Sequence, residues 1–194
     1  MLEADGELLE RYGSVCGVDE AGRGPLAGPV FAAAVILPPG TEIEGLNDSK
    51  KLSEKKREAL YGEICEKAEA WSVASASEKE IDELNILQAT FLAMRRAVEG
   101  VPGAAFALID GNRMPPLDLP GRCVVGGDGK YACIAAASIL AKVSRDRYMY
   151  RLAERYPQYA FEKHKGYGTA LHYQMIRQYG PSPAHRLSFL KKMH

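Results

Sequence analysis

Cysteine is scarce in this sequence, and its few copies form none of the usual metal-binding patterns. The 194 residues contain four cysteines, no two of them in a C-x-x-C pair, and no histidine stands at metal-ligand spacing from any of them. Each cysteine lies in an apolar segment, which is typical of a small buried side chain. We therefore expect buried free thiols without a functional role at Cys16, Cys65, Cys123 and Cys133.

Long hydrophobic runs and a basic leader are also absent. No apolar run approaches the ~20 residues that a membrane span requires. Residues 1–5 are acidic and lack the basic and apolar regions of a secretory signal. The composition, 46% hydrophobic and 26% charged, is that of an ordinary globular chain whose length suits one domain. We expect a cytoplasmic monomer that makes no contact with a membrane.

Net charge is zero for the whole chain but not for its parts. Residues 1–128 carry 13 lysines and arginines against 22 aspartates and glutamates, a net charge of −9. Residues 129–194 carry 12 against 3, a net charge of +9, together with all four histidines. This asymmetry favours a basic face directed at phosphates beside an acidic half that could hold cations. Charge counting leaves open that many of these residues only form solvated helix faces.

The hydrophobic pattern predicts an α/β protein. Apolar runs bounded by turn residues predict strands at 15–18, 30–37, 71–77, 105–109 and 123–125. Helical spacing and capping residues predict helices at about 53–70, 85–98, 130–156 and 169–179, with a break at Pro157.

The order of these elements predicts a five-stranded mixed sheet flanked by helices. Two closely connected strands at the start should pair antiparallel, whereas apolar strands that alternate with helices indicate a parallel extension. We expect a catalytic domain at 1–145 and a helical extension at 146–194 packed on it as one compact unit.

Acidic residues stand where the predicted strands end. Asp19 and Glu20 follow the first strand, Asp110 ends a later one, and Asp128 lies between the last strand and its helix. The carboxyl ends of parallel strands form the crevice in which open α/β sheets bind ligands. Carboxylates that converge there repel one another unless a cation such as Mg²⁺ or Mn²⁺ lies between them.

Such a cluster suits two-metal phosphodiester cleavage, in which two ions roughly 3.5–4 Å apart stabilise the attacking water and the leaving oxygen. Asp19 is the expected bridging ligand because it follows the most central strand. Simpler explanations stay open at this point: Asp128 as a helix cap and Asp110 as a turn residue. Glu20 can share the site with Asp19 only if the strand has ended or bulged, because adjacent strand residues face opposite sides.

Seven motifs, in this order along residues 15–189, resemble those of the ribonuclease HII family. They lie at residues 17–30 (GVDEAGRGPLAGPV), 47–52 (NDSKKL), 85–87 (NIL), 110–112 (DGN), 135–143 (AAASILAKV), 164–169 (HKGYGT) and 183–186 (PAHR). The resemblance implies a ribonuclease H-like fold. It also implies an endonuclease of DNA replication and repair that cuts RNA–DNA hybrids, and DNA containing single ribonucleotides, on the 5′ side of the ribonucleotide to leave 3′-hydroxyl and 5′-phosphate ends. Its catalytic metal ligands would be Asp19, Glu20, Asp110 and Asp128, with two Mn²⁺ or Mg²⁺ ions in the active complex.

The same resemblance implies that Gly22, Arg23, Gly24 and Tyr167 recognise the RNA–DNA junction. Glycines let main-chain N–H groups approach a 2′-hydroxyl or phosphate closely, and that hydroxyl distinguishes RNA from DNA. Tyr167 offers a flat ring and a phenol, and its position between Gly166 and Gly168 predicts exposure.

Further substrate contacts are expected along the basic segments. The candidates are Lys50, Asn85, Ser138, Lys142 and Arg145, of which Ser138 and Lys142 share one helix face. A solvated-face position is an open alternative for Arg145 and, less so, for Lys50. Members of the family commonly carry lysine two residues before the last aspartate, where this chain has Gly126; a phosphate contact is then missing or supplied by Lys130.

Two other functions compete with an active nuclease. A catalytically weak hybrid-binding module would keep the fold, but it gains nothing from carboxylates that face phosphates. A metal-dependent phosphatase of small phosphoesters could use the same acids. The basic C-terminal third and the Gly-Arg-Gly and Tyr167 elements favour a polymeric substrate.

Overall fold

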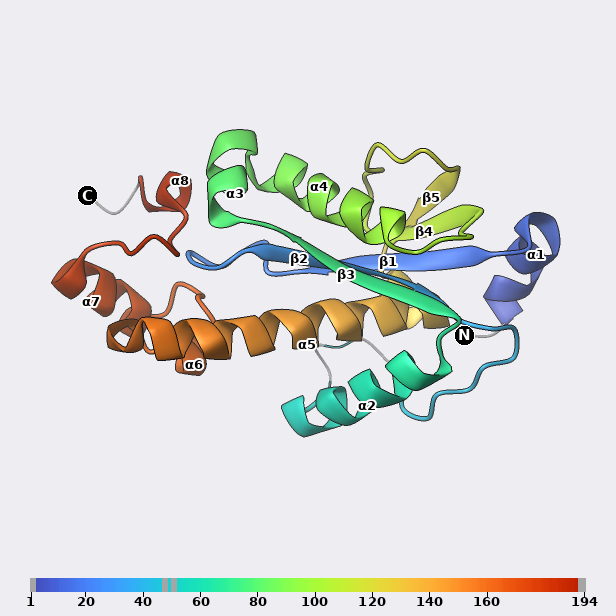
Figure 1. Cartoon of the computed structure of the whole chain (residues 1–194), viewed down its shortest axis with the longest axis horizontal. Coiled ribbons are helices and arrows are strands. Elements are labelled where there is room, and N and C mark those ends of the chain that lie inside the picture. The colour runs from blue at the N-terminus through green and yellow to red at the C-terminus, as the bar shows by residue number, and fades with distance from the viewer. Residues whose placement is uncertain (1–2, 47–48, 50–51, 192–194) are drawn as a thin grey trace.

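The computed structural model describes residues 3–46, 49 and 52–191 and contains one five-stranded mixed sheet (Figure 1). The strand order is β3-β2-β1-β4-β5. Neighbours in β1–β2 and β2–β3 run antiparallel, and neighbours in β1–β4 and β4–β5 run parallel. The strands span Val15–Ala21 (β1), Val30–Ile36 (β2), Ala70–Ala76 (β3), Phe106–Asp110 (β4) and Gly121–Val124 (β5). The expected α/β class and mixed sheet are confirmed.

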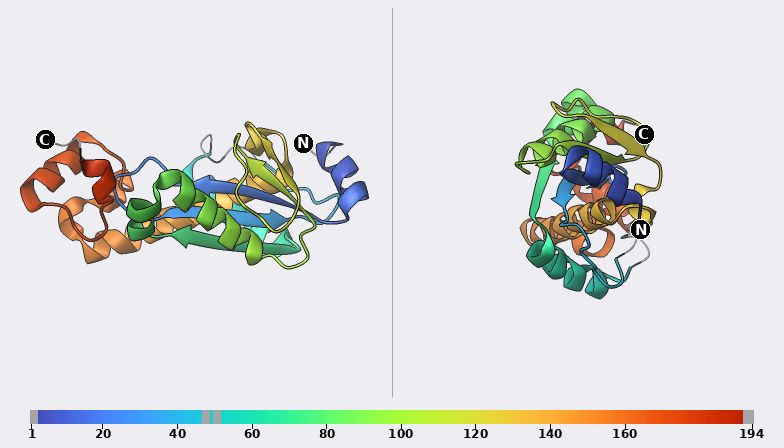
Figure 2. Two further views of the ribbon diagram at one scale, coloured as in Figure 1. Left: turned by 90° about the horizontal axis from the view of Figure 1, so that it is seen from above. Right: turned by 90° about the vertical axis from the view of Figure 1, so that its right-hand side faces the viewer.

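Helices cover both faces of this sheet (Figures 1 and 2). Val18 of β1 belongs to the apolar core under α4 (Ile86–Glu99), which also includes Ala93 and Met94. The other face, with Ala33 and Val35 of β2, packs against α2 (Glu54–Lys67) and α5 (Ala132–Arg155). Alternate strand residues therefore enter different cores, as strand geometry requires.

Local capping signals account for several helix starts. Ser77 and Glu80 form the reciprocal capping box of α3 (Glu78–Leu84). The Asn85 side chain caps α4 by accepting hydrogen bonds from the main-chain N–H groups of residues 87 and 88. The helices that were not predicted include α1 (Glu3–Tyr12), which stacks the ring of Tyr12 on Phe106 with centroids 4.3 Å apart.

The segments that follow α5 gather at one end of the molecule (Figure 2, left). There α5 ends before Pro157, as predicted, and is followed by α6 (Phe161–His164), α7 (Ala170–Tyr179) and α8 (Leu187–Leu190). Because α5 crosses residue 145 without a break, the sheet and this end share one helix. A boundary at residue 145 stays a prediction. Within the described residues no helix is both long and apolar enough to span a bilayer.

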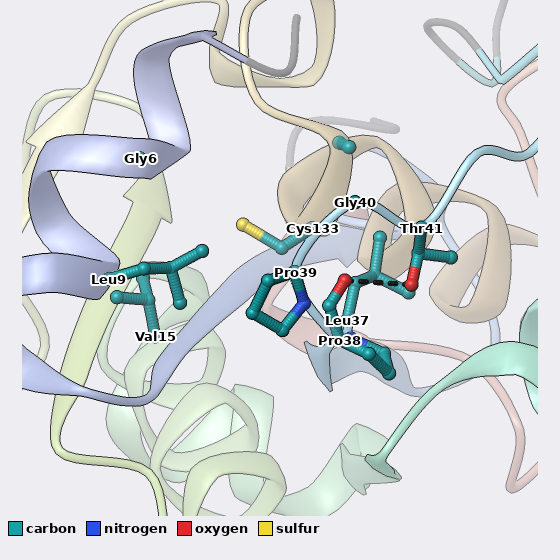
Figure 3. A pocket seen from close by; sticks show the side chains of 10 residues that line it. Gly6, Leu9, Val15, Leu37, Pro38, Pro39, Gly40, Thr41 and Cys133 are labelled. Carbon is teal, nitrogen blue, oxygen red and sulfur yellow. Dashed lines mark hydrogen bonds between the residues drawn. The ribbon is translucent and has the colours of Figure 1, made fainter.

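The cysteines are free thiols, but only Cys16 and Cys133 are buried, whereas Cys65 and Cys123 are half-buried. Cys133 lines a cavity of about 220 Å³ between α1, the loop after β2 and the start of α5. In Figure 3 its sulfur points toward Leu9 and Val15. None of the four strand-end acids lines this cavity, and it has no part in the site described below.

Candidate active site

The register of β1 and β4 brings two of the strand-end carboxylates to the same level of the sheet. Val18 is paired with Ile109 in this parallel ladder, so Asp19 and Asp110 follow as the next residues of neighbouring strands. Val18 and Ile109 both enter the core under α4. Strand alternation therefore turns Asp19 and Asp110 toward the α5 face. Residues 91 positions apart in sequence thus become neighbours.

β1 does not end at Asp19, contrary to the sequence expectation. It continues through Ala21, with Glu20 opposite Ala32 of β2, and no bulge interrupts this part of the ladder. Glu20 therefore leaves the strand on the opposite side from Asp19 and accepts a hydrogen bond from Arg23 Nη1 at 3.3 Å. Pairing with β4 stops at Val18, and the antiparallel partner β2 alone carries the strand onward.

Asp19 is buried and strongly perturbed by its surroundings. Its side chain is buried, with 5% of the residue exposed, and its Oδ1 accepts a hydrogen bond from Glu20 N at 2.7 Å. Burial, and then the charges of Glu20 and Asp110, raise the pKa of Asp19 well above its usual value, while a hydrogen bond with Ser138 lowers it. Such a carboxylate needs a proton or a cation beside it. The oxygen donors and their charge therefore fit a hard divalent ion.

The other two acids are held by the turn that leads into α5. Asp110 Oδ1 accepts a hydrogen bond from Gly127 N at 2.7 Å. Asp128 is buried in the 3-10 turn Gly127–Gly129. The N-cap of α5 is Tyr131, so Asp128 does not serve as its cap. Among the residues that the structure describes, no three acidic, histidine or cysteine side chains are arranged so as to hold a metal ion. Convergence of all four acids on metal ions stays a prediction.

A hollow beside these acids collects most of the expected substrate-binding residues. It measures about 240 Å³ and is lined by Glu20, Ala21, Gly22, Arg23, Gly24, Ser49, Ser138, Lys142 and Tyr167. Tyr167 is 44% exposed. A side chain at Gly24 would meet the Tyr167 ring at 3.7 Å, so the Gly-Arg-Gly loop and the tyrosine lie against each other.

Arg186, which was not among the predicted site residues, binds the Gly-Arg-Gly loop from the side of the protein interior. The arginine is fully buried and donates hydrogen bonds to Gly28 O at 2.8 Å, Arg23 O at 2.9 Å and Gly22 O at 2.6 Å. In a trans peptide the carbonyl and the following N–H point in opposite directions. The N–H groups of Arg23 and Gly24 therefore point away from Arg186. Its place in the 183–186 motif was the only sequence signal for it.

Arg145 is buried rather than exposed on a helix face. Only 1% of the residue is exposed, and its guanidinium donates hydrogen bonds to Lys165 O at 3.0 Å and Ala27 O at 3.3 Å. These hydrogen bonds join residues 165–169, the Tyr167 loop, to the segment before β2. The guanidinium itself stays inside the protein. The solvated-face alternative is therefore wrong for Arg145, and its sequence-based role as a phosphate contact has no support from this position.

The remaining candidates occupy varied positions. Lys142 donates a hydrogen bond to Asp146 Oδ1 at 2.7 Å, and burial lowers the pKa of Lys142. Ser138 is buried with its hydroxyl 2.9 Å from Ser49 Oγ. Asn85 is the cap of α4 described above, and Lys50 lies outside the described residues.

Lys130 lies beside the position at which the sequence departs from the family pattern. Its Nζ donates a hydrogen bond to Val125 O at 2.7 Å, which places the ammonium next to Gly126. A lysine is thus present close to position 126, although its side chain comes from the following turn.

The chain matches the family model described as Ribonuclease HII over residues 16–193. A ribonuclease HII from Dechloromonas aromatica is 61% identical over 184 residues, which cover 94% of each protein. The chain belongs to the ribonuclease HII family. Its enzymes are endoribonucleases, hydrolases that act on the RNA strand of RNA–DNA hybrids.

Solved structures agree with this assignment. Ribonuclease H2 from Pyrococcus horikoshii superposes with a TM-score of 0.74 at 28% identity, covering 90% of this chain and 93% of that one. Bst-RNase HIII in complex with Mn²⁺ shares the fold, with a TM-score of 0.67 at 18% identity, and the match covers 86% of this chain and 63% of that one.

Proposed function

We propose that the chain nicks duplex DNA on the 5′ side of single embedded ribonucleotides, as well as cutting longer hybrids, by two-metal-ion hydrolysis. The observation that carries the proposal is the strand register that sets Asp19 beside Asp110, next to the hollow formed by the Gly-Arg-Gly loop and Tyr167. Acids for the reaction and groups for the junction thus share one edge of the sheet.

Asp19, Glu20, Asp110 and Asp128 would hold the ions. Glu20 leaves β1 on the opposite side from Asp19, so its side chain would have to reach the ions around the free edge of β1, where pairing with β4 has stopped. Bound there, two divalent cations would supply a nucleophilic water and neutralise the charge that develops on the leaving oxygen. The raised pKa of Asp19 supports this assignment, because a cation would remove the repulsion from Glu20 and Asp110. The solved complex of Bst-RNase HIII, which shares this fold, contains Mn²⁺. We infer Mn²⁺ or Mg²⁺ for this chain.

The junction would be read by main-chain and aromatic groups. With their carbonyls held by Arg186, the peptide units of Gly22 and Arg23 present N–H groups on the side away from the protein interior. Such N–H groups can bind a phosphate or a 2′-hydroxyl, and only RNA carries the latter. Tyr167, in contact with the same loop, can pack against the sugar of the ribonucleotide.

The deciding experiment uses duplex DNA with one ribonucleotide, incubated with Mg²⁺, with Mn²⁺ or with a chelator. We expect a metal-dependent nick on the 5′ side of the ribonucleotide, and none in a duplex of DNA alone. Asp19→Asn should abolish cutting while largely preserving substrate binding. Asp118→Asn, in an exposed loop, serves as the matched control and should cut normally. Normal cutting by Asp19→Asn would refute the metal assignment, and binding without cutting by the wild-type chain would favour the weak binding module.

The role of Tyr167 has a separate test. Tyr167→Ala should lose more activity on single-ribonucleotide substrates than on long hybrids, because only the former depend on one junction. Tyr179→Ala, which removes another exposed tyrosine at the end of α7, should lose neither. Equal losses on both substrates would remove the junction role of Tyr167. A cytoplasmic location and a monomeric state accompany this proposal and stay predictions.

A further inference from the structure

Three histidines are buried together behind the Tyr167 loop. His164 ends α6, His172 lies in the first turn of α7, and His185 lies before α8; their exposed fractions are 7%, 0% and 2%. The rings of His164 and His172 stack with centroids 4.2 Å apart. Neither the sequence motifs nor the proposed reaction assigns these side chains a role. Buried imidazoles of this kind need a defined set of hydrogen-bond partners.

Main-chain groups at both ends fix the protons of two of these rings. At one end, Ser182 N donates a hydrogen bond to His185 Nδ1 at 2.9 Å, so that nitrogen carries no proton. At the other end, His172 Nδ1 lies 2.9 Å from Tyr167 O. A carbonyl can only accept, so His172 Nδ1 carries a proton and donates it. Both assignments follow from groups whose donor or acceptor character cannot change.

The donor and the acceptor of the hydrogen bond between the two rings are then fixed. His172 Nε2 and His185 Nε2 lie 3.0 Å apart. A neutral imidazole has one donor and one acceptor nitrogen, so the proton of His185 is on Nε2 and the lone pair of His172 is on Nε2. The result is a one-way relay from Ser182 N–H through both rings to the carbonyl of Tyr167. A second proton on His172 would place two N–H donors face to face between the rings. A second proton on His185 would remove the acceptor of the hydrogen bond from Ser182 N.

His164 supports the same loop in a similar way. Gly166 N donates a hydrogen bond to His164 Nδ1 at 3.2 Å, and His164 Nε2 lies 2.8 Å from Tyr159 O. The proton of His164 is therefore on Nε2. Burial is the main cause that lowers the pKa of all three histidines, to about 4 for His172 and for His185. All three rings are neutral near pH 7.

We propose that His172 and His185 are positioning residues that hold the Tyr167 main chain through this relay and so keep the tyrosine ring against the Gly-Arg-Gly loop. The inference rests on the proposed role of Tyr167 at the junction. His185 of the relay also directly precedes Arg186, the residue that fixes the Gly-Arg-Gly carbonyls. One short segment, 182–186, thereby orients both parts of the junction site.

The first test measures the relay without any assay of activity. In wild-type protein labelled with ¹⁵N, long-range ¹H–¹⁵N correlation spectra at pH 7 report which ring nitrogen of each histidine carries the proton. We expect Nδ1–H for His172 and Nε2–H for His164 and His185. An Nε2–H form of His172, or a doubly protonated ring, would overturn the relay whatever the enzyme does.

The second test separates the two ends of His172. His172→Asn places an amide near the Nδ1 position and can still donate to Tyr167 O, whereas His172→Gln keeps a group near Nε2 and lacks this donor. We expect His172→Gln to raise KM for the single-ribonucleotide duplex about tenfold, the effect of losing one buried hydrogen bond, with kcat nearly unchanged. His172→Asn should recover most of the loss. Equal behaviour of the two variants at matched thermal stability would overturn the proposal.

The third measurement asks whether the effect passes through Tyr167. In a Tyr167→Ala background, His172→Gln should cause no further loss, because residues that act through one another are not additive. A full additional loss would show a general structural effect instead and would contradict the inference. If Tyr167→Ala alone changes nothing, the junction role in the proposed function fails, whereas the tautomer spectra still decide whether the relay exists.

Discussion

Acidification should destabilise this fold through His172 and His185. Each imidazole is almost completely buried and neutral, and burial lowers its pKa from about 6.5 to about 4. In the unfolded chain the same groups take up protons near pH 6.5. The unfolded state therefore binds more protons between pH 6.5 and pH 4, and the free energy of unfolding falls as the pH falls through this window. Above pH 6.5 the effect is absent, and below pH 4 it is complete.

The size of the effect follows from the pKa change. A difference of this size corresponds to roughly 3 kcal/mol for one histidine over the whole window, and to about 1 kcal/mol between pH 6 and pH 5. Asp19 acts in the opposite direction, because its pKa is raised in the folded state and the folded protein takes up its proton more readily. The histidine contribution must therefore be measured as a difference between two proteins.

Urea unfolding of wild-type protein and His172→Asn at pH 7, 6 and 5 isolates this contribution. His164 and His185 face the ring of His172 and are present in both proteins, as is Asp19, so their effects largely cancel. We expect the stability of wild-type protein relative to the variant to decrease by about 1 kcal/mol from pH 6 to pH 5. A difference that does not change with pH would refute the reasoning, because His172 would then titrate alike in the folded and unfolded chains.

Two further expectations concern the packing behind the site. Gly17→Ala should lower the free energy of unfolding by about 3 kcal/mol or more, because its new Cβ would lie 2.2 Å from the main-chain carbon of Cys133 in α5. Gly62→Ala on α2, where a Cβ would meet nothing within 4 Å, should raise the free energy of unfolding by roughly 0.5 kcal/mol. Urea unfolding measures both. Arg186→Lys should lower the free energy of unfolding by about 3 kcal/mol and weaken substrate binding, because the lysine cannot hold the same carbonyls. Its control, Arg147→Lys in an exposed ion pair, should change the free energy of unfolding by less than about 1 kcal/mol. A mild Gly17→Ala, or an Arg186→Lys no worse than its control, would contradict the packing described here.

The strand-end acids show how far sequence reasoning reaches. Apolar strands that stop at Asp19 and Asp110 predict that carboxylates gather at one edge of the sheet. The alternation of strand residues also predicts that Glu20 and Asp19 leave a continuous strand on opposite sides. The point at which β1 ends was not predictable, because its last residues pair only with β2, and strand propensity carries no information on which partner persists.

Burial of charged and polar side chains was the main failure of the sequence reasoning. Charge implies exposure in a pattern-based interpretation, so Arg145 was placed on a surface and the histidines were counted with a basic face. The structure buries Arg145, Arg186 and three histidines because the irregular segments around residues 22–29 and 165–169 contain many carbonyls that no ladder satisfies. Which carbonyls need a side-chain donor depends on the path of a loop, and local sequence patterns do not specify that path.

Arg186 links this buried polar network to the chemistry at the surface. A guanidinium presents five N–H donors in a rigid fork, which lets one side chain hold the carbonyls of Gly22, Arg23 and Gly28 at once; an ammonium is a point charge without that geometry. Burial lowers the pKa of Arg186 to about 9, so the group is still charged at neutral pH. The loop is thus oriented with its N–H groups outward and has a positive charge directly behind them. Both features favour a phosphate on the outer side of the loop. Main-chain N–H groups with a buried cation behind them attract an anion more strongly than the N–H groups alone.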